Sequence, residues 1–353
     1  MWKMKVLKMN VIRCFFLLGI SLPLLASCTD DSDSYTYGVW KERSDFDGKA
    51  RNGAASFMIG AQGYICGGYN GKRTEYFNDL WEYNTSGNYW TQMASMPDEA
   101  GLRRTTATGF SIGSKGYVTT GYDWVDAKYL ADTWEYDPTT NSWAQKDDYA
   151  GGARQYALGF TIGNYGYVGT GYNDNCLKDF YRFDPTAAAG SQWQKIDGFG
   201  GSKRMGGTAF VINDVAYICT GINNNTYVTD LWKFDPSASE PWVSLRKIID
   251  DDDDNDFDDD YTTITRAYAV SFVIDNKGYL VTGEAGGYRT DYWVYDPTTD
   301  LWNNEDFTPF EGSGRSGAVA FSTGTRGFVT TGASSSYYFD DTWELLPYEL
   351  EEE

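Results

Sequence analysis

Short segments in which aromatic and polar residues alternate recur along the chain and predict half-buried β-strands. Most of them start with an aspartate and carry an aromatic pair two positions apart, as at residues 79–83, 132–136 and 291–295. Since side chains two apart share one face of a strand, this pattern buries one face and leaves the other polar. A turn then leads to another strand, which is marked by a tryptophan at Trp90, Trp143, Trp193, Trp242 and Trp302.

These segments belong to a longer repeat. Six copies open with an arginine, and successive arginines are 53, 50, 50, 62 and 49 residues apart, by subtraction of their numbers. Each arginine precedes a strand, a tight turn and a second strand that ends at a glycine. Four short strands per copy at this period predict the blades of a β-propeller. The six opening residues are Arg51, Arg104, Arg154, Arg204, Arg266 and Arg315.

The two ends of the repeat region predict how the ring of blades closes. The sixth copy lacks a fourth strand with a tryptophan, whereas Trp40 stands alone near the N-terminus, 50 residues before its counterpart Trp90. We expect the strand around Trp40 to complete the last blade, because this pairing removes the open edge of its sheet. Five complete copies and one shared copy then give six blades.

The unit resembles the Kelch repeat in its four strands, its strand-ending glycine, its Tyr/Trp-rich third strand and the tryptophan of its fourth. The resemblance implies an all-β fold, a six-bladed β-propeller of four-stranded antiparallel blades. The sequence departs from the family in one respect, since the paired glycines occur only at Gly67-Gly68 and a threonine replaces the first elsewhere. We place the propeller at residues 38–347, after an acidic tether at 28–37 and before an acidic tail at 348–353.

Residues 1–27 have the order of a bacterial lipoprotein signal peptide. Basic residues precede a short apolar run, which ends in Leu25-Ala26-Ser27-Cys28 and resembles a lipobox. The resemblance implies export, cleavage before Cys28 and a lipid on its thiol that anchors the protein in the bacterial outer membrane. The acidic residues 29–33 either resemble the surface-export signal of Bacteroidetes lipoproteins or form a solvated linker. Exposure at the cell surface therefore stays open.

Composition excludes several classes of function. The formal net charge of −21 disfavours nucleic acid as a partner. The chain contains no histidine, which excludes serine-histidine triads and histidine metal sites. Galactose oxidase shares the Kelch architecture, but its copper ligands include histidines, so that activity is excluded. We therefore favour a binding module over an enzyme.

The loops that differ between copies are the candidate ligand-binding positions. The loop between strands two and three lies on the same face of a blade as the loop into strand one, and Kelch proteins that bind peptides or sugars use this face. Here it carries Tyr69, Tyr122, Trp124, Tyr172 and Tyr288, whose rings suit a sugar or a peptide. We expect the six opening arginines around the channel mouth of this face. They either bind a ligand or bond an aspartate or carbonyl of the neighbouring blade.

An acidic insertion at residues 250–260 lengthens the interval between Arg204 and Arg266. We expect it on the arginine face in one of three roles: a solvated loop, a Ca²⁺ site or an internal counter-ion for the arginines. It lacks the spacing of an EF-hand loop. No other cofactor is expected. The calcium candidates are Asp250, Asp252, Asp254 and Asp256.

Three functions remain in consideration. The first is a lipid-anchored module that binds glycan or protein ligands through the loop face. The second is a sugar enzyme, because sialic acid mutarotases are also six-bladed Kelch proteins; an arginine would hold the sugar carboxylate and Glu284 would be the acid-base group. The third is a scaffold subunit of a surface complex. We favour the first.

Overall fold

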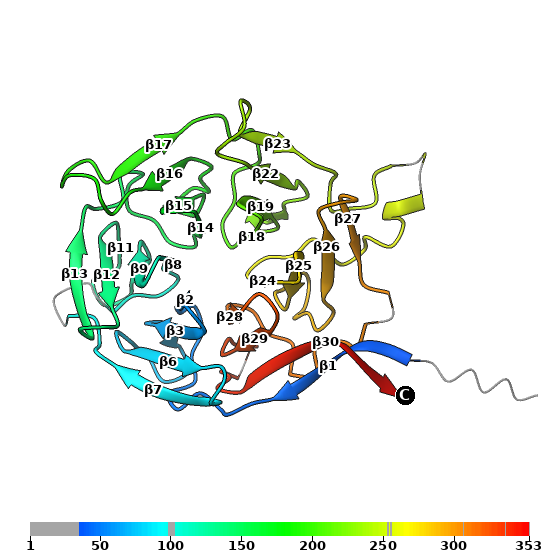
Figure 1. Ribbon diagram of the computed structural model, residues 1–353, viewed down its shortest axis with the longest axis horizontal. Helices are drawn as coiled ribbons and strands as arrows, with labels where there is room; N and C mark the ends of the chain where they lie inside the picture. The colour runs from blue at the N-terminus through cyan, green and yellow to red at the C-terminus, as the bar shows by residue number, and fades with distance from the viewer. Residues whose placement is uncertain are drawn as a thin grey trace, which may run out of the picture. The chain divides into compact units, whose positions relative to one another are not determined.

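The computed structural model describes residues 35–97, 103–252, 254, 256–305, 307–335 and 337–352. The predicted signal peptide and Cys28 lie outside these residues. Six four-stranded antiparallel sheets are arranged in a ring, with the first strand of each innermost (Figure 1). The expected six-bladed propeller is thus confirmed. Within the described residues no helix has both the length and the apolar character needed to cross a bilayer.

Each blade contains four strands in the order of the chain, apart from the last, which takes its outermost strand from the N-terminus. The blades are β2 (Ala55–Ile59), β3 (Gln62–Cys66), β6 (Leu80–Asn84) and β7 (Tyr89–Met93); β8 (Thr108–Ile112), β9 (Lys115–Thr119), β12 (Thr133–Asp137) and β13 (Ser142–Lys146); β14 (Leu158–Ile162), β15 (Tyr165–Gly169), β16 (Phe180–Phe183) and β17 (Trp193–Ile196); β18 (Thr208–Ile212), β19 (Val215–Cys219), β22 (Trp232–Phe234) and β23 (Trp242–Ser244); β24 (Val270–Ile274), β25 (Lys277–Val281), β26 (Trp293–Asp296) and β27 (Leu301–Asn303); β28 (Val319–Ser322), β29 (Gly327–Thr330), β30 (Thr342–Glu352) and β1 (Tyr35–Glu42).

The N-terminal strand closes the ring as predicted. β1 pairs antiparallel with β30, and Trp40 lies opposite Leu345 (Figure 1). The Trp40 side chain is only 2% exposed and makes an edge contact with Phe310, with ring centroids 4.9 Å apart. Both strands run past the boundaries drawn from the sequence, since β1 begins at Tyr35 and β30 extends to Glu352.

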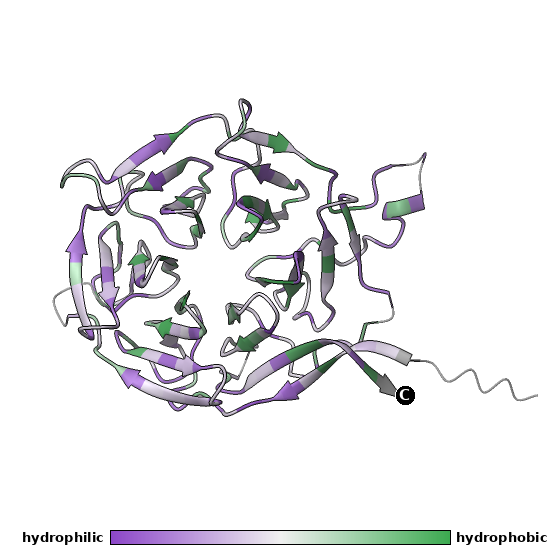
Figure 2. Cartoon of the chain, in the orientation of Figure 1, coloured by the Kyte–Doolittle hydropathy of each residue, from purple (hydrophilic) through white to green (hydrophobic). Residues whose placement is uncertain are grey.

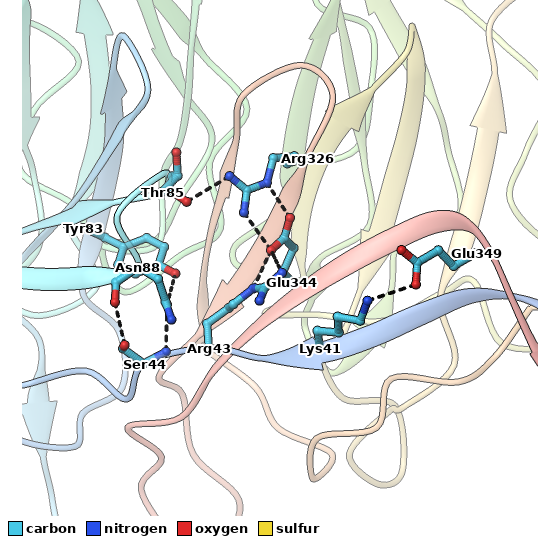
Figure 3. A network of polar contacts seen from close by, with 9 residues as sticks. All are labelled: Lys41, Arg43, Ser44, Tyr83, Thr85, Asn88, Arg326, Glu344 and Glu349. Carbon is cyan, nitrogen blue, oxygen red and sulfur yellow. Dashed lines mark hydrogen bonds and ion pairs between the residues drawn. The ribbon is translucent and has the colours of Figure 1, made fainter.

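A buried carboxylate reinforces this closure. Glu344 of β30 is 1% exposed and receives hydrogen bonds from the guanidinium groups of Arg43, which follows β1, and Arg326, which precedes β29. Arg326 also donates to the backbone carbonyl of Thr85 in the first blade, at 2.8 Å (Figure 3). Although burial opposes its ionisation, these two arginines hold the pKa of Glu344 below its ordinary value. One carboxylate therefore links the N-terminal strand, the last blade and the first blade.

Aromatic rings and glycines pack successive blades together. A phenylalanine of strand one stacks on a tyrosine of strand two in five blades, as in Phe57 and Tyr64 with centroids 5.1 Å apart. For four of these five phenylalanines a glycine in strand two of the next blade makes room for the ring, because a Cβ on Gly116, for example, would lie 2.1 Å from Phe57. Hydrophobic segments accordingly recur along the strands of every blade (Figure 2).

Candidate functional site

The loop face is the face that carries the loops into strand one and the loops between strands two and three. Three of the latter loops form two-stranded ribbons: β4 (Tyr69–Asn70) with β5 (Glu75–Tyr76), β10 (Tyr122–Asp123) with β11 (Lys128–Tyr129), and β20 (Ile222–Asn223) with β21 (Thr226–Tyr227). Each of the predicted aromatic residues lies on this face. The ribbons present their side chains on ordered backbone, which favours a binding surface over loose turns.

The side chains of the six opening arginines are buried and bond within their own blade rather than to a ligand surface or a neighbouring blade. All six side chains are at most 1% exposed, and each forms an ion pair with the aspartate at the start of strand three of its own blade. Each also donates to the carbonyl of the residue 16 positions further along. These bonds occupy most of the guanidinium donors, as burial of an arginine requires. The Nε groups of Arg104 and Arg266 have no hydrogen-bond partner among the described residues. The aspartates are Asp79, Asp132, Asp179, Asp230, Asp291 and Asp341.

The arginine backbone, in contrast, joins neighbouring blades. The carbonyl of each arginine accepts a hydrogen bond from the glycine after strand two of the preceding blade, as Arg104 does from Gly68 at 2.9 Å. The ring of six such bonds closes through Gly332 and Arg51, at 2.8 Å. Gly68 has a φ of +90°, which suits glycine. The six opening arginines thus have structural positions, since their side chains bond within a blade and their backbones bond between blades. They are Arg51, Arg104, Arg154, Arg204, Arg266 and Arg315.

A second ring of backbone hydrogen bonds surrounds the channel mouth. The residue two positions after each arginine donates its N–H to the carbonyl of its counterpart in the preceding blade, at 2.6–3.3 Å. We call these six residues the rim. All have positive φ, including Thr106 (+54°), Tyr156 (+54°) and Tyr268 (+56°), a conformation that costs about 1–3 kcal/mol in residues other than glycine and clusters at functional sites. The rim consists of Gly53, Thr106, Tyr156, Gly206, Tyr268 and Gly317.

The two rim tyrosines belong to an aromatic group at the mouth. Tyr156 and Tyr268 have ring centroids 5.0 Å apart. Burial raises the pKa of Tyr268 to about 12, and the nearby Glu284 carboxylate contributes. Burial likewise raises the pKa of Tyr69 to about 12, helped by the neighbouring Tyr338 and Tyr288. We call Tyr69, Tyr156, Tyr268, Tyr288 and Tyr338 the mouth tyrosines.

Glu284 is the acidic member of this neighbourhood. Its backbone pairs in both directions with Ala267, the residue that precedes Tyr268. Its carboxylate contributes to the raised pKa values of Tyr156, Tyr268 and Tyr288, after burial in each case. The structure thus brings together Glu284, Tyr69 and Tyr288 from the sequence-based candidates.

The other three aromatic candidates form a separate group above the second and third blades. Tyr122 contacts Trp124 with centroids 4.9 Å apart and Tyr129 at 5.1 Å, and Tyr129 in turn lies 6.3 Å from Tyr172. Trp124 is 50% exposed although its indole N–H donates to the Thr105 hydroxyl. This group offers an exposed aromatic surface on the same face as the mouth.

A basic cleft of about 480 Å³ adjoins the mouth tyrosines. Its lining includes Lys49, Lys72, Arg73, Asn70 and Tyr338, and Tyr338 contacts Tyr69 with centroids 6.0 Å apart. The cleft also holds one carboxylate, that of Asp340. Asn70 is 6% exposed, and its side-chain oxygen has no hydrogen-bond partner within the described part of the chain. A ligand donor would satisfy that oxygen.

The acidic insertion lies at the outer edge of the fifth blade and not above the mouth. Its short helix η1 (Asp256–Asp258) is beside β27 (yellow in Figure 1). Tyr261 and Ile264 are buried against Trp293 and Trp302 of that blade. The expectation of a counter-ion for the arginines is therefore wrong, because each arginine already has its own aspartate. Most described residues of the segment are exposed, as expected for a solvated loop, but Asp258 is buried and Phe257 packs against the core of the fifth blade.

Sequence reasoning missed several of these residues. The six aspartates were visible as the first residue of every third strand, a repetition that matches the arginines one to one. Tyr156 and Tyr268 occupy a position that is glycine in three other copies, which signals a positive φ. Lys72, Arg73 and Tyr338 had no such signal, since only the fold brings the first and last blades together.

The ring of six four-stranded blades, with its arginine-aspartate pairs and aromatic loop face, defines a β-propeller of the Kelch type. Residues 40–221, just over half of the chain, match the KLHDC2/KLHL20/DRC7 Kelch-repeats domain, and the chain belongs to this family. No curated protein matches the sequence. Among solved structures, the one described as "Structure of YjhT" is similar, with 14% identity and a TM-score of 0.68 over 85% of this chain and 95% of that one. At that identity the likeness concerns the fold alone.

Proposed function

We propose that the protein is a glycan-binding module that holds an acidic sugar on its loop face. The observation that carries this proposal is the continuity between the mouth tyrosines and the basic cleft, which meet at Tyr338. Aromatic rings bind the apolar faces of sugars, and short polar groups fix their hydroxyls. The cleft supplies cations for a carboxylate or sulfate group next to the ring.

The local charge of the cleft favours an acidic ligand although the protein as a whole is acidic. The exposed Lys72 and Arg73 and the ion-paired Lys49 outnumber Asp340 in the cleft. At physiological salt the Debye length is about 8 Å, so the nearest charges dominate over the net charge of −21. Of the two roles considered for the opening arginines, ligand binding is thus proposed instead for Lys72 and Arg73.

Anchoring of this module by a lipid on Cys28 is part of the proposal. It rests on the resemblance of residues 25–28 to a lipobox and on the basic and apolar residues before them. A lipid anchor in the outer membrane would hold the loop face near glycans or partner proteins of the envelope. Binding to a protein partner is the outcome that a glycan screen without hits would favour.

A second candidate function is acid-base chemistry on a sugar ring. The observation in its favour is Glu284, the carboxylate that lies among tyrosines of raised pKa at the mouth. Arg289 lies five residues further on, and its buried Nε has no hydrogen-bond partner among the described residues. A carboxylate beside a bound sugar could transfer a proton to or from it, as interconversion of anomers requires. Polarimetry of a freshly dissolved acidic sugar, with Glu284→Gln as the comparison, tests this activity.

The binding proposal is tested by calorimetry with an oligosaccharide that contains a uronic acid and with its neutral counterpart. Replacing both Lys72 and Arg73 by alanine should weaken binding of the acidic sugar at least tenfold, since a hydrogen bond to a charged group contributes about 1.5–3 kcal/mol. The neutral sugar should be affected little. Tyr69→Ala should weaken both, because it removes a stacking surface.

The matched control is Lys178→Ala, an exposed lysine in the corresponding loop of the third blade, outside the cleft. Its affinity for the acidic sugar should equal that of the unaltered protein. Equal losses in this control and in the double variant would show that the effect is one of general charge. Failure of the unaltered protein to bind either sugar would refute the glycan proposal.

A further inference from the structure

The described residues of the acidic insertion pack against the fifth blade. The backbone N–H of Tyr261 donates to the carbonyl of Asp258 at 2.9 Å, directly after helix η1. The hydroxyl of Tyr261 accepts the backbone N–H of Trp302 in β27, at 2.7 Å. Phe257 packs against the same core, and the guanidinium of Arg246 lies 4.5 Å from its ring. The insertion therefore has a fixed place on which a site can be built.

Three carboxylates converge within it. Asp250, Asp258 and Asp259 each offer one oxygen, and these oxygens lie within 4.8 Å of one another. Opposite ligands of a Ca²⁺ ion are separated by about 4.6–5.2 Å, since each Ca–O distance is about 2.3–2.6 Å. Three oxygens that lie this close to one another can therefore all reach a single Ca²⁺ ion.

Asp258 provides the independent observation, because it is a buried acid with an unused oxygen. Its side chain is 1% exposed. One carboxylate oxygen accepts the backbone N–H groups of Asp251 and Asp252, at 2.9 and 3.1 Å. The other, Oδ1, is buried and has no hydrogen-bond partner within the described residues. Such an oxygen is costly unless a proton or a cation meets it.

The neighbouring basic side chains are engaged elsewhere. Lys247 forms an ion pair with Asp251, and Arg246 donates to the carbonyl of Thr299. Among the ion pairs of the described residues, none reaches Asp250, Asp258 or Asp259. The negative charge of the group is therefore not balanced by a described lysine or arginine.

We propose that Asp250, Asp258 and Asp259 bind a Ca²⁺ ion that fixes the insertion against the fifth blade. An oxygen-only donor set of high negative charge suits a hard divalent cation, and water completes the six to eight ligands of Ca²⁺. Of the residues predicted from the sequence, only Asp250 belongs to this group; Asp252, Asp254 and Asp256 do not. The ion would stabilise η1, and through Tyr261 it would hold Trp302 of β27.

The proposal is tested by melting the full chain after removal of divalent cations with a chelator, followed by addition of Ca²⁺. With the free ion at 100 times its dissociation constant, the melting temperature should rise by about 5 °C, given the stabilisation expected from mass action and roughly 2 °C per kcal/mol for a domain of this size. Mg²⁺ should raise it less, because it demands a smaller octahedral site. Terbium luminescence sensitised by Tyr261 provides a direct second measurement.

Asp258→Asn and Asp259→Asn should each abolish the rise. Asparagine keeps the size and one acceptor oxygen of Asp258, and Asp259 is exposed, so both variants should fold. Asp254→Asn, in the same insertion but outside the group, should keep the full rise at equal ionic strength. Absence of a Ca²⁺ effect in the unaltered protein, or the same effect in all variants, would overturn the proposal and leave the glycan site untouched.

Discussion

The buried Glu344 gives a direct test of how the ring is held closed. Replacing it by glutamine removes its charge and leaves its size unchanged. The variant loses both charge-assisted contacts, to Arg43 of the N-terminal segment and to Arg326 before β29. We expect the first and last blades to separate more easily, because the carboxylate is the shared partner of both arginines.

The magnitude follows from burial. Breaking a buried ion pair by removing one partner costs about 3–5 kcal/mol. In Glu344→Gln the side chains of Arg43 and Arg326 lose their ionic partner, but they are 27% and 34% exposed, so water can hydrate them in part. The free-energy cost should therefore lie at the lower end of this range. At roughly 2 °C per kcal/mol, a loss of about 3 kcal/mol lowers the melting temperature by about 6 °C. Glu349→Gln is the control, because its ion pair with Lys41 is exposed and contributes less than about 1 kcal/mol.

The pH dependence provides a second measure of the same contact. The pKa of Glu344 is depressed in the folded protein, so its contribution is fully present above the unfolded value of about 4.3 and is lost as the pH falls through the folded value. The difference in melting temperature between Glu344→Gln and the unaltered protein should therefore be full at pH 7 and shrink below pH 4. A variant that melts within a degree of the unaltered protein at pH 7 would refute this role.

Three further predictions concern closure, the mouth and the anchor. Trp40→Ala should cost about 3–5 kcal/mol in chemical unfolding, since it empties a buried aromatic position in the closing strand; an unchanged unfolding midpoint would argue against closure by β1. Gly206→Ala should displace the Tyr268 ring, because the new Cβ would lie 2.5 Å from it, and should therefore weaken sugar binding in calorimetry. An unaltered affinity would show that the rim does not contribute to ligand binding. Cys28→Ala should move the protein to the aqueous phase of a detergent partition, and retention with the membrane would contradict the lipobox.

The architecture was predictable because the same residue types recur at corresponding positions in each copy of the repeat. Each copy contains the same aromatic strands, so an orphan Trp40 could be matched to a missing fourth strand and the blade count followed. The outer ends of β1 and β30 were not predictable in this way. They extend beyond the repeat, and residues 350–352 of the expected acidic tail pair with the N-terminal strand.

The functional face was predictable in outline only. A guanidinium that recurs in every blade is compatible with a ligand or with a structural partner, and its role depends on burial, which the sequence does not state. The aspartate that recurs with each arginine, such as Asp79 with Arg51, indicates the structural role. The basic cleft joins Lys72 of the first blade to Tyr338 of the last, residues that only ring closure makes neighbours.

The acidic insertion shows that the overall charge of a segment does not by itself predict how the segment packs. A run of aspartates predicts a solvated segment, yet Ile248, Tyr261 and Ile264 flank it and are buried at 0%, 3% and 0% exposure. Apolar residues at both ends of a polar run indicate a segment that is pinned at its ends. That signal was present in the sequence, and it predicts buried ends for a run whose described aspartates are mostly exposed.

The rim combines a repeated backbone arrangement with side chains that differ from blade to blade. Six backbone hydrogen bonds fix the positions of the rim residues, so only their side chains decide how far the opening is obstructed. Tyr156 and Tyr268 of the third and fifth blades pack together beside Gly206, whereas at Gly53 and Gly317 the side chains of Tyr69 and Asn52 lie where a rim side chain would be. The six rim positions are therefore equivalent in their backbone bonds but not in the side chains around them, so a ligand at the mouth would meet a different surface at each blade.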